Sequence, residues 1–124
     1  MNESIGVSKM VEIVAVSVFI LFDIVTGIIR ALYNEGLNST NLRKGLFHKL
    51  TELIAVLGAY LLEYGIQYIQ LGFDVPLLKA TTAYICLMEL ISILENLASV
   101  NPALGRFFKP YLEKLKTKGD EKDE

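Results

Sequence analysis

The sequence has few of the residues that enzymes and metal proteins use for their chemistry. It contains one histidine, one cysteine and no tryptophan among 124 residues. The single cysteine, Cys86, excludes an internal disulfide, and the lack of a Cys/His cluster excludes a zinc site. A glycine-rich phosphate-binding loop is also absent. We therefore expect no catalytic residue, no cofactor, no metal and no nucleic-acid partner.

Polar residues are scarce over most of the chain. Hydrophobic residues make up 52% of the sequence, and they are concentrated in three apolar segments, 10–33, 50–71 and 75–98. Each segment is about as long as a helix that crosses the hydrocarbon core of a bilayer. The alternative is a soluble helical bundle, but the first segment favours membrane insertion even with Asp23 near its centre. We therefore predict an all-α integral membrane protein with three transmembrane helices.

Basic residues are unevenly distributed around these segments. The stretch 34–49 contains Arg43, Lys44 and Lys49, whereas the short connection between the second and third segments contains no lysine or arginine. Cytoplasmic loops of membrane proteins carry an excess of lysine and arginine. The stretch 34–49 is therefore predicted to be a basic cytoplasmic loop, and its three basic residues are predicted to determine the topology.

The two ends of the chain complete the predicted orientation. With three spans and an inner first loop, the N-terminal tail 1–9 lies outside and the C-terminal tail 99–124 lies in the cytoplasm. The C-terminal tail is highly charged, and its last residues, 119–124, include no apolar side chain that could be buried. We expect residues 119–124 to be disordered.

Each apolar segment also carries polar residues at helical spacing, so that they share one face of the helix. Ionisable groups at membrane depth are costly and normally face protein or water. The candidate pore-lining or assembly residues are Glu12, Asp23 and Thr26 in the first segment, Glu52, Glu63 and Gln67 in the second, and Lys79, Glu89, Ser92, Glu95 and Asn96 in the third.

Two interpretations of these polar stripes stay open. The stripes could meet inside one compact chain, with the carboxyl groups protonated or paired to Lys79 and Arg30. They could instead line water in an oligomer. Because the acidic residues outnumber the cations at membrane depth, we favour the interpretation with water or self-association.

Three motifs of the sequence resemble a known family. They are Asp23-Ile24-Val25-Thr26-Gly27 in the first segment, Asn38-Ser39 with Arg43-Lys44-Gly45-Leu46 and Lys49 after it, and Glu89-Leu90-Ile91-Ser92-Ile93-Leu94-Glu95-Asn96 in the third. In this order and spacing they resemble the phage lysis and toxin-secretion holin family of Gram-positive bacteria and their phages. In that family a glycine and a proline usually follow the third motif, whereas here Asn101-Pro102 and Gly105 have a different arrangement.

The resemblance implies a protein of the bacterial cytoplasmic membrane that oligomerises into a lesion and releases an endolysin or a toxin. Its implied partners are other copies of itself, the lipid bilayer and, in some systems, an antiholin. The residues themselves leave a second function open, a small ion-conducting channel or transporter subunit that uses intramembrane carboxylates. A non-conducting scaffold or holin antagonist is a third alternative.

Overall fold

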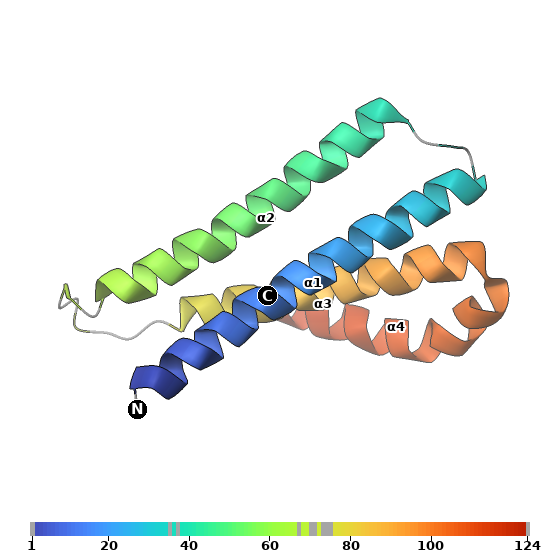
Figure 1. Cartoon of the computed structure of the whole chain (residues 1–124). Coiled ribbons are helices and arrows are strands. Elements are labelled where there is room, and N and C mark those ends of the chain that lie inside the picture. The colour runs from blue at the N-terminus through green and yellow to red at the C-terminus, as the bar shows by residue number, and fades with distance from the viewer. Residues whose placement is uncertain are drawn as a thin grey trace.

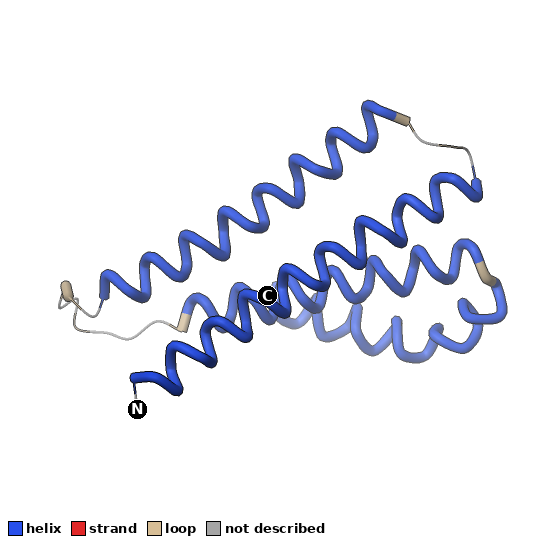
Figure 2. Tube along the Cα trace, viewed as in Figure 1, coloured by secondary structure: helices blue, strands red, loops and turns tan. Residues whose placement is uncertain are grey.

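The residues that the structure describes form four helices (Figures 1 and 2). The computed structural model describes residues 2–34, 36, 38–66, 68–69, 72 and 76–123, and among these residues it contains no strand. The helices are α1 (Asn2–Asn34), α2 (Ser39–Ile66), α3 (Leu77–Val100) and α4 (Pro102–Asp123). Three of them contain stretches long and apolar enough to cross a membrane, namely Gly6–Asn34, Ser39–Ile66 and Leu77–Val100. This confirms the predicted all-α class with three helices of membrane-spanning length.

Helix α2 begins earlier than its apolar segment. Gly36 has a positive φ of 86°, and Asn38 then caps the helix by accepting hydrogen bonds from the backbone amides of Thr40 (2.9 Å) and Asn41 (3.3 Å). Asparagine is among the preferred N-cap residues because its side chain satisfies amides that lack an intrahelical partner. As a consequence, most of the predicted loop 34–49 is helical.

The C-terminal part also differs from the expectation. The tail 99–124 was predicted as a charged extension that is disordered over residues 119–124, but α4 runs from Pro102 to Asp123. Asn101 starts this helix in the same way as Asn38 starts α2, by accepting hydrogen bonds from the amides of Ala103 (3.1 Å) and Leu104 (3.3 Å). Proline at the first helical position fits this cap, because its missing N–H needs no partner there.

Helix α3 is the element against which the others pack (Figure 1). Helices α1 and α4 both lie along α3, whereas α2 contacts α3 and touches α1 over only a short stretch. The core is small and apolar, and it consists of Val16 and Ile20 of α1, Val56 and Ala59 of α2, and Leu78 and Ile85 of α3. Since α1 and α2 share few contacts, the attachment of α2 depends on α3 and on the polar groups between the helices.

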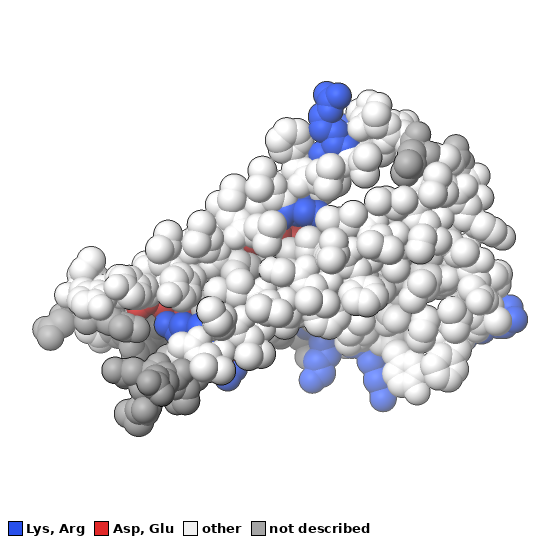
Figure 3. All heavy atoms as spheres, viewed as in Figure 1, with Lys and Arg blue, Asp and Glu red and all other residues white. Residues whose placement is uncertain are grey.

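The outward faces of α1 and α2 are apolar. Many of their large hydrophobic side chains are exposed, including Val14, Leu21 and Phe22 of α1 and Ile54, Leu57 and Leu61 of α2. Figure 3 shows this face as almost free of charged residues, apart from the ends of the helices and a hollow between α1 and α2. Lipid chains would cover such a surface without cost, because they are as apolar as the side chains.

Candidate functional site: a charged cluster between three helices

Lys49 of α2 lies at the centre of a charged cluster. Its ammonium donates hydrogen bonds to both carboxylate oxygens of Glu89 in α3, at 2.7 Å to Oε1 and 2.6 Å to Oε2. It also forms an ion pair with Asp23 of α1. Basic and acidic atoms are visible together in the hollow between α1 and α2 (Figure 3). Lys49 therefore joins the three helices of membrane-spanning length through a single side chain.

The cluster is largely shielded from solvent. Only 3% of Glu89 and 7% of Asp23 are exposed. Removing charges from water is expensive, and close pairing with additional hydrogen bonds is needed to offset that cost. The two carboxylates therefore depend on Lys49, because losing the ammonium would leave both of them buried without a cation.

An amide extends the cluster along α1 and α3. Asn96 of α3 donates hydrogen bonds through Nδ2 to Asp23 Oδ1 (3.0 Å) and to Thr26 Oγ1 (3.1 Å). Its Oδ1 accepts a hydrogen bond from the Arg30 guanidinium at 3.3 Å. Asn96 thus connects Asp23 with polar groups three and seven residues further along α1, which is the spacing of one helix face.

Glu52 brings a third carboxyl group to the cluster. One of its oxygens, Oε1, lies 3.8 Å from the Lys49 ammonium and 3.1 Å from His48 Nδ1. The other oxygen, Oε2, is buried and has no hydrogen-bond partner among the described residues. Three carboxyl groups therefore surround one lysine, and one buried acceptor stays unsatisfied, an arrangement that costs free energy.

A cleft opens beside the cluster, between α1 and α2 at the ends that their connection joins. Its volume is about 880 Å³. Asp23, Lys49 and Asn96 line it together with apolar side chains such as Ile28 and Leu46. The charged cluster is therefore next to a space large enough for several water molecules, although its carboxylates are buried.

Glu63 belongs to a separate site near the other end of α2. Its Oε1 accepts a hydrogen bond from the backbone amide of Leu78 (3.3 Å), and its Oε2 lies 3.7 Å from the Lys9 ammonium of α1. The Leu78 amide is in the first turn of α3, where backbone N–H groups lack intrahelical partners and attract negative charge. Glu63 thus ties the start of α3 to α1 and α2.

The remaining predicted residues lie in several different environments. Glu12 is half-buried on α1, Ser92 lines the cleft, and Glu95 lies 3.5 Å from Lys116 of α4. Lys79 is exposed and lies in none of the ion pairs of the described residues. Gln67 lies outside the described residues.

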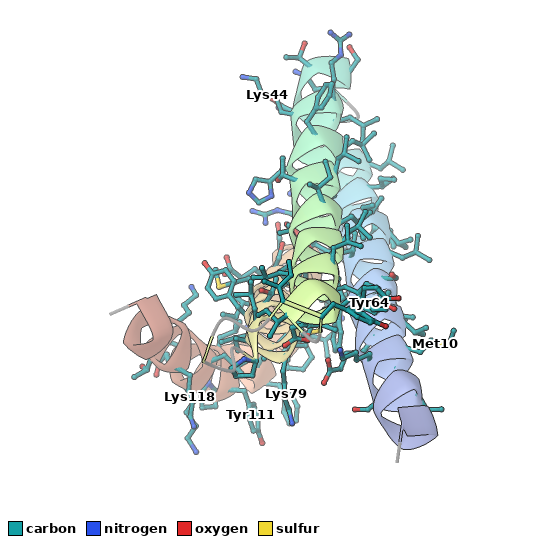
Figure 4. The ribbon with its side chains drawn as sticks, turned by 90° about the vertical axis from the view of Figure 1, so that its left-hand side faces the viewer. Met10, Lys44, Tyr64, Lys79, Tyr111 and Lys118 are labelled. Atoms are coloured by element: carbon teal, nitrogen blue, oxygen red, sulfur yellow. The ribbon has the colours of Figure 1, made fainter. Side chains whose placement is uncertain are left out.

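The interpretation that places the polar stripes inside one chain pairs the carboxyl groups with Lys79 and Arg30. In the structure Lys79 belongs to none of the ion pairs of the described residues, and Arg30 bonds to the amide of Asn96. Lys49, predicted to help determine the topology, is also the central cation of the cluster, and its effect on topology stays a prediction. Arg43 and Lys44 are exposed on the first turns of α2, where Lys44 points away from the other helices (Figure 4).

The sequence did contain a signal for Lys49. Lys49 lies three residues before Glu52, so it shares the helix face that continues through Val56 and Ala59. The polar stretch 34–49 predicts a loop, however, and a loop residue has no helix face.

Across the described part of the chain, no group of three His, Cys, Asp or Glu side chains could hold a metal ion. What the cluster can do is hold three helices together through buried charges and release them when the charges gain water.

The chain matches the model of a known protein family. A family model described as Bacteriophage holin family matches residues 5–117. No curated protein and no solved structure matches the chain. The matched range includes α1, α2 and α3 almost entirely, and with them every residue of the charged cluster.

Proposed function

Since the chain belongs to the bacteriophage holin family, we propose that it oligomerises in the cytoplasmic membrane and forms a lesion that releases an endolysin or a toxin. It is a multi-pass membrane protein with three helices of spanning length. The proposal concerns the steps beyond membrane residence: assembly, opening and release of the cargo.

The charged cluster is the observation that supports the proposal best. Asp23, Lys49 and Glu89 come from three different helices and are paired with one another inside one chain. The outward faces of α1 and α2 are apolar. A single chain can therefore reside in the bilayer with its polar groups paired and its apolar groups against lipid.

The same residues can line water once several chains assemble. Helix α2 has few contacts with α1, so it can move away from α1 without breaking a large apolar interface. Such a movement would expose Asp23 and Lys49, together with the unpartnered oxygen of Glu52, to water that enters from the cleft. Hydration then replaces the ion pairs, and the polar faces of several chains line the lesion.

The direct test is controlled expression in a bacterium together with a cytoplasmic endolysin. The protein should accumulate without effect, then collapse the membrane potential abruptly and release the endolysin. Stable growth at high membrane abundance of the protein would contradict the proposal. Co-expression with a known lysis system separates a holin from an antagonist, because an antagonist delays that system's lysis.

The second candidate function is a small ion-conducting subunit. The pairing of Asp23 and Glu89 with Lys49 at membrane depth supports it, because intramembrane charges also mark ion and proton pathways. Pore size distinguishes the two candidates. A selective channel passes ions but retains a folded reporter protein in the cytoplasm, whereas a holin lesion releases that reporter.

A further inference from the structure

The starting point of α4 is fixed by a very short link to α3. Helix α3 ends at Val100, Asn101 is extended with φ −128° and ψ 98°, and α4 begins at Pro102. With one residue between the helices, α4 must start at the membrane surface where α3 emerges. This holds for either orientation of the chain in the membrane.

Helix α4 cannot stay beside α3 once α3 spans a bilayer. The two helices approach closely at Gly105, where an added Cβ would lie 3.1 Å from Ala98 Cβ, and Lys116 lies 3.5 Å from Glu95. At 1.5 Å per residue, α4 is about 33 Å long, comparable to the hydrocarbon core. Its basic side chains would enter the lipid, and each basic residue at mid-membrane lowers the insertion equilibrium roughly a hundred-fold.

The surface of α4 matches a different environment, the boundary between lipid and water. Phe107 and Tyr111 are 63% and 54% exposed, and their rings lie 5.9 Å apart. Figure 4 shows Tyr111 and Lys118 pointing to the same side, away from α1 and α2. Residues 102–118 contain five basic residues and one acidic residue, Glu113, so this stretch has a net charge of +4.

From these features we infer that α4 is an interfacial helix, which turns about Asn101 and lays its Phe107–Tyr111 face into the anionic membrane surface beside α3. Aromatic side chains at this depth keep their rings in lipid and their polar ends in water. Each lysine or arginine near an anionic surface adds roughly a five-fold preference for it. The inference requires only that α3 spans the membrane, and it does not depend on lesion formation.

The test uses the full-length protein in vesicles, with Cys86→Ser as the background. An environment-sensitive fluorophore is attached to Tyr111→Cys on the apolar face, or to Glu113→Cys as the matched control on the polar face. In vesicles of phosphatidylcholine with phosphatidylglycerol, the probe at position 111 should shift to the blue and be quenched by lipid-borne quenchers. The probe at position 113 should stay solvated. Lys114→Gln and Lys118→Gln should each lower the ratio of buried to solvated probe roughly five-fold.

Three outcomes would overturn the inference. The first is equal solvation of the probes at positions 111 and 113. The second is burial that depends on the protein-to-lipid ratio rather than on phosphatidylglycerol, which would assign the face to a second copy of the chain. The third is efficient disulfide formation between Glu95→Cys and Lys116→Cys in the vesicles, which would show that α4 stays on α3.

Discussion

Replacing Lys49 with methionine should open the space between α1 and α2. Methionine keeps the unbranched chain as far as Cε and removes the ammonium that pairs with Asp23 and Glu89. Removing one partner of a buried ion pair costs about 3–5 kcal/mol. Lys49 itself is 16% exposed and lines the cleft, so we expect the lower end, about 3 kcal/mol. That corresponds to roughly a hundred-fold shift toward chains in which α2 has moved away.

Interspin distances measure this shift directly. Nitroxides at Val25→Cys and Leu57→Cys, in the Cys86→Ser background, report the separation of α1 and α2 from exposed positions. In lipid nanodiscs Lys49→Met should populate a longer distance, and in cells it should bring lysis forward. The matched control is Lys44→Met on the same helix, where the side chain is exposed and a change within about 0.5 kcal/mol is expected.

A compensated variant separates the loss of the charge from a general loss of stability. Adding Asp23→Asn and Glu89→Gln to Lys49→Met removes the two carboxylates to which the ammonium bonds most closely, so most of the closed population should return. If Lys49→Met and Lys44→Met have the same distance distribution and the same lysis time, Lys49 does not hold the helices together.

Three further perturbations test individual contacts. Asn96→Ala removes the amide that donates to Asp23 Oδ1, and it should destabilise the closed state by about 1–3 kcal/mol in the same distance measurement. Glu63→Ala leaves the Leu78 amide without its acceptor; hydrogen exchange at that amide should accelerate, consistent with about 1 kcal/mol for a lost helix cap. A cysteine at Asn38 should react with a membrane-impermeant reagent only after cells are opened, and reaction in intact cells would contradict the predicted orientation.

The sequence predicts the number and type of the main helices better than their ends. Apolar segments of about twenty residues identify the stretches that need an internally bonded backbone in lipid. Helix α1 contains the first segment, whereas the second extends beyond the end of α2 at Ile66 and the third begins before α3 at Leu77. Hydropathy indicates which residues lie within the membrane, but it does not indicate the hydrogen bonds with which a helix begins. The polar residues 38–41 therefore predicted a loop, although Asn38 is the N-cap of α2. Asparagine is common in both settings, and only the structure distinguishes them.

The sequence predicts which helix faces contribute to the candidate site, but it does not predict which charged residues pair with one another. Helical spacing placed Asp23, Glu89 and Asn96 on polar faces, and the structure brings these three residues together. Which cation meets which carboxylate depends on the relative rotation and height of separate helices. The spacing within one helix contains no information about that, so Lys79 was as plausible a partner as Lys49.

The cluster contains more acidic than basic groups, and this inequality affects both the stability of the closed chain in the membrane and its opening. Among the described residues, three carboxyl groups face a single ammonium around Lys49, and Glu52 Oε2 has no hydrogen-bond partner. The closed arrangement is thus held by strong contacts but is left with an uncompensated excess of acidic groups. If the chains assemble as proposed, all three carboxyl groups gain water, and the ion pairs of Lys49 are the contacts that are lost. A second lysine beside Glu52, as in His48→Lys at the exposed position four residues earlier, should therefore prolong the closed state and delay lysis. Unchanged timing at equal membrane abundance would argue against this balance.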